Sequence, residues 1–331
     1  MIKETILFIL TVLILNSCNS GIVGAWKNNN IDNYKRDQIK ILNDKLFNGL
    51  RNNDVASVKS LLSDVLLEKS GGDLESIISK VSSYSLPDKY RILDEYYVRN
   101  STTGIINTIP SGLSGENDYI IKFLALNKEM YISLILPNEF DNELLITIIY
   151  GKYGNDWKIN VLQFNQYSFF GKTAPDYFKI AKERYEKSYL IDAVNNISIS
   201  RQCLRPAVNE IFQYLKEKEI NEFYDKVMTE VNTKFKFPMT LDEIKTKPQI
   251  FRITPELMAE GFVPTIFYLT EINLKDTVAL KIEYEQIKNE ANQLFTGINK
   301  DKQFVFYWAF NEIPVGQNKV NRYGFIDKLT K

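Results

Sequence analysis

The feature that most constrains the fold is a change of residue pattern at Pro87. Before it, apolar residues such as Ile39, Leu42 and Leu46 recur at helical spacing. After it come runs of Ile, Tyr, Phe and Leu separated by Asn, Gly, Pro and Asp, a pattern typical of strands. Helices followed by a meander of strands predict an α+β domain with an antiparallel sheet over residues 31–170.

The two patterns also set the expected elements of this domain. The expected helices cover residues 39–50, 55–66 and 74–81. Asp54 has the residue type and position of an N-cap for the second helix, and Gly71 and Gly72 should end it. The expected strands cover residues 90–99, 119–126, 130–136, 144–150 and 157–164. A turn over residues 151–156, which contains Gly and Asn, should join the last two strands into a hairpin.

Two stretches of this domain resemble the NTF2-like, cystatin-related superfamily. Residues 148–162 resemble its long final hairpin, with Trp157 near the start of the last strand. Residues 46–62 resemble its first helices, and the resemblance covers about residues 36–168. It implies a curved sheet that wraps the helices around a cone-shaped cavity, which members of the superfamily use for catalysis, use for ligand binding or fill with side chains.

Four neighbouring residues of the first expected strand have side chains that could serve acid–base chemistry in such a cavity. They are Asp94, Glu95, Tyr96 and Tyr97. The simpler interpretation is an ordinary strand with one solvated face. No catalytic residue of an isomerase or dehydratase of the superfamily maps onto this chain, so the sequence assigns no catalytic residue.

The first 17 residues predict a signal peptide. A short polar start is followed by about ten apolar residues, too few for a membrane-spanning helix. Directly after this run stands Leu15-Asn16-Ser17-Cys18, which resembles a lipobox, the processing motif of bacterial lipoproteins. The alternative is an ordinary signal peptide that is followed by a cysteine by chance. Residues 18–30 are small and polar, and we expect them to form a tether between lipid and domain.

The lipobox resemblance implies a lipoprotein precursor that is cut between Ser17 and Cys18. The Cys18 sulfur would then carry a diacylglycerol, and acylation of the new amino group would add a further chain, which together give firm attachment to membrane lipid. Asn19 is not Asp, the residue that in some bacteria marks retention in the inner membrane. We therefore expect the mature protein in the cell envelope, anchored to the outer membrane on its periplasmic side or at the cell surface.

Residues 171–240 predict a helical segment. Tyr177, Ala181 and Ala193 fall near tetratricopeptide spacing, and residues 176–204 resemble one helix pair of that family. A single pair cannot form the peptide-binding groove of a repeat array, so we expect it to pack or to space other parts, with partner binding as the alternative.

Residues 241–331 predict a second small α+β unit. Its expected strands cover residues 249–253, 265–272, 303–311 and 323–327. Between the second and third strands, Leu280, Tyr284 and Ile287 belong to an apolar helical stripe, and Glu283 is assigned to the polar side. The alternating aromatic residues of the third strand favour buried core over an aromatic ligand surface; they are Phe304, Phe306, Trp308 and Phe310.

Composition excludes several classes of function. The chain contains no histidine, which rules out Ser-His-Asp triads, Cys–His pairs and His-ligated zinc. Lys plus Arg and Asp plus Glu both number 41, and we expect no nucleic-acid partner. Cys203 lies in an apolar helical stretch, where a buried, inert thiol is expected and a reactive one is the alternative. We also expect no cofactor and no metal ion.

Three functions are compatible with these features. The favoured one is a non-enzymatic, lipid-tethered envelope protein that binds or scaffolds an envelope protein, a small ligand or an envelope polymer. The second is a small-molecule-binding protein or an enzyme that works by Asp, Glu and Tyr chemistry in the NTF2-like cavity. The third is a protein-interaction module on the helical segment.

Overall fold

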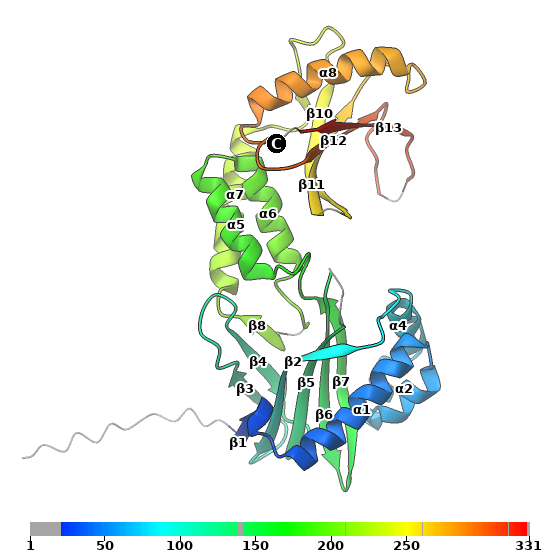
Figure 1. Ribbon diagram of the computed structural model, residues 1–331, viewed down its shortest axis with the longest axis vertical. Coiled ribbons are helices and arrows are strands. Elements are labelled where there is room, and N and C mark those ends of the chain that lie inside the picture. The colour runs from blue at the N-terminus through cyan, green and yellow to red at the C-terminus, as the bar shows by residue number, and fades with distance from the viewer. Residues whose placement is uncertain (1–20, 138–141, 209, 260, 317, 330–331) are drawn as a thin grey trace, which may run out of the picture.

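The computed structural model describes residues 21–137, 142–208, 210–259, 261–316 and 318–329, and the fold is α+β (Figure 1). The expected lipobox, with Ser17 and Cys18, lies outside these residues. In the described part of the chain the strands form three sheets. The sheets and the helices that cover them enclose three hydrophobic cores.

Four helices form a layer on one face of the larger N-terminal sheet. They are α1 (Asn33–Arg51), α2 (Val55–Leu61), α3 (Asp64–Ser70) and α4 (Asp73–Ser82). Asp54 caps α2 as expected, but the helix expected over residues 55–66 is two helices. Leu62 leaves the helical conformation to pair with Ile159, and Ser63 caps the next helix. The contact with the sheet therefore divides a continuous apolar pattern.

The larger N-terminal sheet has the strand order β1-β2-β5-β6-β7, and all its neighbouring strands are antiparallel. These strands are β1 (Ile22–Lys27), β2 (Tyr90–Asn100), β5 (Glu129–Pro137), β6 (Leu144–Tyr153) and β7 (Asp156–Gln166). On the helical face, Tyr131, Ile148 and Tyr150 are fully buried in one core with α1 to α4. Side chains fill this part of the space in which the resemblance implied a cavity.

The tether expected over residues 18–30 is wrong for residues 22–30. Residues Ile22–Lys27 form strand β1, which pairs with the edge of β2. Asn28–Asn30 form a short 3-10 helix that leads into α1. A six-residue strand with two small residues carries little local signal, and its hydrogen-bond partners are about 70 residues away in the chain, so a local pattern could not reveal it.

A smaller sheet lies over the other face. It has the order β3-β4-β8, with β3 (Ile106–Pro110), β4 (Tyr119–Leu124) and β8 (Phe212–Tyr214). Tyr96 and Val98 of β2 share one core with Ile121 and Phe212 of this sheet. Strand β8 comes from the segment expected to be helical, residues 171–240. That segment therefore also completes the first unit, which is the N-terminal part of the protein that contains both of these sheets.

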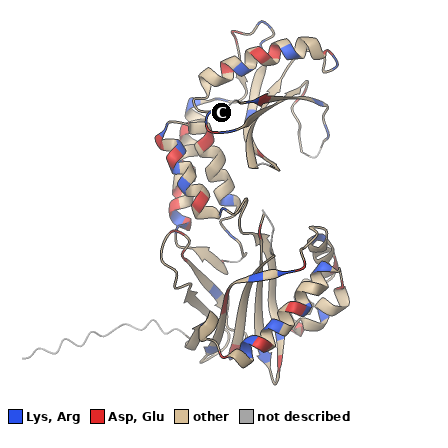
Figure 2. Ribbon diagram, viewed as in Figure 1, with Lys and Arg blue, Asp and Glu red and all other residues tan. Residues whose placement is uncertain are grey.

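Three helices connect the two ends of the molecule (Figure 1). They are α5 (Ala174–Glu186), α6 (Leu190–Gln202) and α7 (Glu217–Lys234). Helices α5 and α6 form the helix pair expected over residues 176–204. Ile197 of α6 belongs to the core beneath the smaller sheet, whereas Leu190 of α6 and Val227 of α7 belong to the core of the C-terminal unit. Acidic and basic residues mix along α5 and α7 (Figure 2).

The C-terminal unit is a five-stranded sheet covered by one long helix. Its strands are β9 (Met239–Thr240), β10 (Gln249–Met258), β11 (Gly261–Leu269), β12 (Phe304–Phe310) and β13 (Arg322–Lys328), in the order β13-β12-β11-β10-β9. Helix α8 (Thr277–Leu294), capped by Asp276, joins the parallel pair β11 and β12. An ion pair links the unit to α6: Lys302 Nζ lies 2.6 Å from Asp192 Oδ2, and burial raises the pKa of Asp192 while it lowers the pKa of Lys302.

The central strand β12 is covered unequally on its two faces. Val305, Tyr307 and Ala309 are fully buried in the core under α8. On the other face Phe310 is buried, but Phe304, Phe306 and Trp308 keep partial contact with solvent. The arginine side chain of Arg322 stacks on Trp308 at 3.9 Å from the ring centre. For the four alternating aromatic residues, the expectation of buried core therefore holds fully for Phe310 and only in part for Phe304, Phe306 and Trp308.

Glu283 is buried, although the sequence assigned it to the polar side of α8. It lies three residues after Leu280 and four before Ile287, which is the same helical face, and only 2% of it is exposed. Thr246 donates a hydrogen bond to one carboxylate oxygen, and the other has no partner among the described residues. The apolar stripe of α8 thus contains a carboxylate that is only half satisfied.

We predict that Glu283→Gln stabilises the protein by about 1 kcal/mol at neutral pH, because an amide is less costly to bury than a carboxylate with an unmade hydrogen bond. The free energy of unfolding in urea, followed by circular dichroism, measures the effect. Glu271→Gln, at an exposed position, is the matched control and should change little. A loss of stability in Glu283→Gln alone would show that the carboxylate is needed.

Candidate functional site

Two adjacent carboxylates in the middle of β2 form the centre of the candidate site. Asp94 is 5% exposed and Glu95 is 3% exposed. Because successive side chains of a strand point to opposite faces, Asp94 faces the smaller sheet and Glu95 faces helix α1. Buried charges are costly unless they are paired and hydrogen-bonded, so the partners of these two groups decide what they can do.

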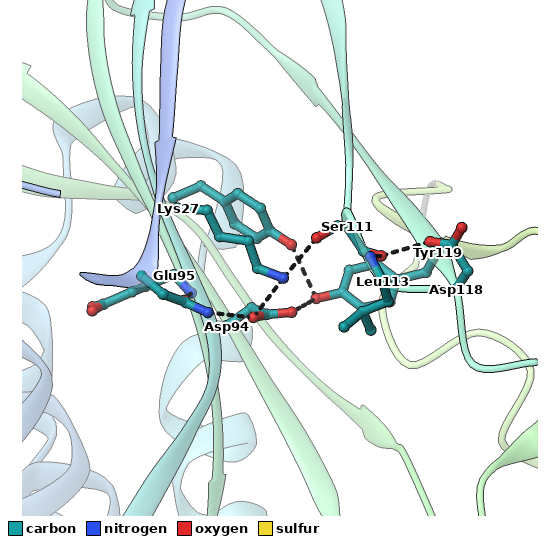
Figure 3. Close-up of polar contacts among 9 residues, drawn as sticks. Lys27, Asp94, Glu95, Ser111, Leu113, Asp118 and Tyr119 are labelled. Atoms are coloured by element: carbon teal, nitrogen blue, oxygen red, sulfur yellow. Dashed lines mark hydrogen bonds and ion pairs between the residues drawn. The ribbon is translucent and has the colours of Figure 1, made fainter. Parts of the chain in front are cut away.

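Asp94 is surrounded by donors from three elements (Figure 3). Lys27 Nζ, at the end of β1, lies 2.9 Å from its Oδ1 atom. Asn28 Nδ2 donates to the same oxygen at 2.8 Å. The hydroxyl of Tyr119, on β4, donates to Oδ2. Both oxygens of this buried carboxylate are therefore occupied by groups of the same chain.

A second set of contacts ties these donors to one another (Figure 3). Lys27 Nζ also donates to the Ser111 carbonyl oxygen at 2.6 Å, and the hydroxyls of Tyr96 and Tyr119 lie 3.1 Å apart. The Asn28 side-chain oxygen accepts from the backbone N–H of Glu95 at 2.9 Å. The last residue of β1 and the residue that follows it are thereby fixed to β2 and to the loop between β3 and β4.

Glu95 is satisfied in the same way on the helical face. Arg36 Nε, on α1, donates to its Oε1 atom at 2.6 Å, and Tyr131 OH, on β5, donates to Oε2 at 2.6 Å. The hydrogen bond to Glu95 raises the pKa of Arg36. Burial, reinforced by the hydrogen bond to Glu95, raises the pKa of Tyr131 well above its usual value. Tyr131 thus stays a neutral donor at physiological pH.

The two tyrosines beside Asp94 are held neutral as well. Burial is the main cause that raises the pKa of Tyr96 and of Tyr119 far above the ordinary value of a phenol, and the charge of Asp94 adds to it. A phenol in this state donates a hydrogen bond but does not accept a proton. The network is suited to hold layers together rather than to transfer protons.

Beside this network, a groove of about 690 Å³ lies between α1 and the first half of β2. It exists because the pairing with β1 ends at Tyr96, which leaves residues 90–95 of β2 without a neighbouring strand on that side. One face of α1 and the exposed edge of β2 line it with both signs of charge; its charged residues are Arg36, Asp37, Lys40, Asp44, Asp88, Lys89 and Glu95. The groove is suited to bind a polar partner.

Within the groove, Asp44 is held by two donors. Lys40 Nζ lies 2.6 Å from Asp44 Oδ2, and Tyr90 OH donates to Oδ1 at 2.6 Å. Burial acts to raise the pKa of Asp44, but the hydrogen bonds from Lys40 and Tyr90 outweigh it and leave the pKa below its usual value. Asp44 is therefore an anionic anchor in the groove wall, not a proton acceptor at neutral pH.

The four residues singled out in the sequence do not meet in one cavity. Asp94 and Tyr96 face the smaller sheet, whereas Glu95 and Tyr97 face the helical side, where Tyr97 donates to Glu129. The interpretation of β2 as a strand with one solvated face is wrong here, because residues 94–98 are buried on both faces. The alternation of side chains along a strand was the sequence signal that the neighbours Asp94 and Glu95 must point to opposite faces of the sheet.

The sequence did not reveal the partners of these carboxylates. Lys27 lay in the expected tether, and Tyr119 and Tyr131 were expected only as ordinary strand residues.

Cys203 is fully buried just after α6, and burial raises its pKa to about 12. Among the described residues, no group of three or more acidic or cysteine side chains is placed to hold a metal ion, and no helix is long and apolar enough to cross a membrane.

We predict that Asp94→Ala lowers the free energy of unfolding by about 3 kcal/mol, because it leaves the Lys27 ammonium and the Tyr119 hydroxyl without their shared acceptor. Asp88→Ala, which removes an exposed carboxylate paired with Arg51, is the matched control and should change little. Urea unfolding measures both. Equal effects of the two substitutions would contradict a stabilising role for the buried network.

We predict that Cys203 is inert in the folded protein. With a pKa of about 12, roughly one thiol in ten thousand is ionised at pH 8, and the side chain is also inaccessible. In a Cys18→Ser variant, which leaves Cys203 as the only thiol, an aromatic disulfide reagent should react slowly before unfolding and fully in guanidinium chloride. Rapid reaction of the native protein would instead indicate an accessible thiol.

Comparisons with known proteins assign no family to this chain. No family model matches it, and neither a curated protein nor a solved structure does. The resemblances to a lipobox, to the NTF2-like superfamily and to a tetratricopeptide helix pair therefore stay predictions from the sequence.

Proposed function

We propose that this chain is a lipid-anchored, non-enzymatic protein of the bacterial cell envelope, held to the outer membrane through acylated Cys18. In this proposal the folded part binds an envelope protein or a small polar ligand, with the groove between α1 and β2 as its binding surface. The lipobox motif supports the anchor, and the geometry around β2 supports the binding role.

The observation that carries the non-enzymatic assignment is the full occupancy of the two buried carboxylates. All four oxygens of Asp94 and Glu95 accept hydrogen bonds from residues of the same chain. A general base needs an oxygen that can reach a substrate proton, and a general acid needs a proton to give. With the nearby tyrosines held neutral, this arrangement favours a structural role for residues that had the right types for catalysis.

The groove favours binding because it is open and carries both signs of charge. Its volume of about 690 Å³ is within the range of small-ligand sites, and its walls come from a helix and a strand edge that the buried network fixes in place. A ligand that carries both positive and negative groups, or both hydrogen-bond donors and acceptors, suits such a surface better than an apolar ligand does.

The helical segment offers less support for a protein-interaction role. Its exposed large apolar side chains, among the described residues from 176 to 235, are Val208 and Leu215. Both lie in the connections on either side of β8 and not on a helix face. An apolar docking stripe along the helices would need several such residues together. Packing between the two units is the role that the contacts of α6 and α7 favour.

The test of the anchor is metabolic labelling in a bacterial host with an alkyne-bearing palmitate. The wild-type chain should take up the label and appear in the membrane fraction. Cys18→Ala should lose the label and stay at precursor mass, because the lipid acceptor is gone. Cys203→Ala, which removes the other cysteine, is the matched control and should keep the label. Labelling of Cys18→Ala, or no labelling of the wild-type chain, would refute the proposal.

A further inference from the structure

The distance from the expected lipid to the fold is short. Strand β1 begins at Ile22, and the described chain starts at Gly21, three residues after Cys18. Three extended residues span at most about 11 Å. With Cys18 at the headgroup level of a bilayer, the end of the sheet at which β1 begins would therefore lie against the membrane surface, without room for a flexible spacer.

Two other segments surround the point where the chain enters the fold. The Gly21 carbonyl oxygen accepts from the backbone N–H of Ser101 at 2.7 Å, and the side chain of Ile105 packs against the Gly21 α-carbon. The backbone N–H of Asn100 donates to the Lys128 carbonyl oxygen at 2.7 Å. The loop between β2 and β3 and the turn between β4 and β5 thus lie at the same end of the molecule as β1.

Exposed apolar and basic side chains lie at this end, beside the exposed hydroxyl residues Ser101, Thr102 and Thr103. Val23 is 64% exposed, Ile106 is 74% exposed and Leu124 is 44% exposed, and the last two are cross-strand partners in the smaller sheet. Arg99 and Lys128 are also exposed. Glu129, the cross-strand partner of Arg99, is an acidic residue at this end, and its carboxylate pairs with Lys35 and accepts a hydrogen bond from Tyr97. Isolated exposed apolar residues are common in proteins and need no explanation. This cross-strand pair, however, lies beside the expected lipid attachment point, so the bilayer would be its neighbour.

We propose that this end is a membrane-facing surface, formed by Val23, Arg99, Ile106, Leu124 and Lys128, that rests on the bilayer to which Cys18 is attached. The inference rests on the proposed lipid anchor and adds an orientation to it. Val23, Ile106 and Leu124 would enter the boundary between headgroups and acyl chains, and the two cations would face anionic headgroups.

The orientation places the other parts of the protein away from the membrane. β1 lies at the end of the molecule opposite the C-terminal unit, with α5, α6 and α7 between them (Figure 1). The helices therefore act as a spacer that carries the C-terminal sheet outward from the bilayer. A contact of two or three apolar side chains would be too weak by itself to hold the protein, but an acyl anchor a few residues away keeps it in place.

The test uses the lipidated full chain in vesicles of phosphatidylethanolamine and phosphatidylglycerol. An environment-sensitive fluorophore is attached to a single new cysteine, in Ile106→Cys or Leu124→Cys, while lipidated Cys18 and buried Cys203 do not react. Ile282→Cys, at a 61% exposed position on α8, is the matched control. We expect a blue-shifted emission and quenching by brominated lipid at positions 106 and 124, and neither change at 282.

The outcomes separate the surface from the anchor. Mass spectrometry of the N-terminal peptide reports independently whether Cys18 carries lipid. If Cys18 is lipidated and the probes at 106 and 124 behave like the probe at 282, the membrane-facing surface is refuted and the anchor stands. If Cys18 carries no lipid, both proposals fail. Quenching at 106 and 124 that Arg99→Glu with Lys128→Glu reduces severalfold would support the charge contribution.

Discussion

Burial of two neighbouring carboxylates on opposite faces of one strand is the constraint on which the first unit depends. Each needs a cation, and one short stretch of chain supplies both: Lys27 at the end of β1 reaches Asp94, and Arg36 on α1 reaches Glu95. Asn28, between them, binds the Asp94 side chain and the Glu95 backbone. The path of the chain from the edge strand, around the edge of the sheet and onto the helical face is fixed by these charges, because a buried carboxylate left without its cation is strongly destabilising.

Much of the fold could be predicted from local pattern, and the misses have physical causes. The long helices and strands carry strong periodicity, so α1, α8 and the strands from β5 to β7 lie close to their expected positions. Strand β1 was missed because its stability comes from a distant partner, and the helix over residues 55–66 was divided by a contact between Leu62 and the sheet. Glu283 was misplaced because its charge outweighed its position on the apolar face.

The candidate site was accessible to sequence reasoning only in part. The residue types of Asp94 and Glu95 pointed to a special position, but a single sequence does not state which residues lie across the fold. Lys27 and Tyr119 reach Asp94 over separations of 67 and 25 residues, and their approach depends on the register of β1 on β2 and on the position of the smaller sheet. The groove beside α1 exists because the pairing of β1 with β2 stops at Tyr96, and the types of the residues there do not reveal where the pairing stops.

Strand β8 lies far along the chain from its partner β4, and this separation affects how the chain acquires its structure during synthesis. The smaller sheet is complete only when Phe212–Tyr214 pairs with β4, after two helices have been made. An amino-terminal fragment that ends at residue 170 would expose the apolar side of β4 and half a core. The first unit therefore cannot complete its core when residue 170 leaves the ribosome, and it must wait until about 45 further residues have followed.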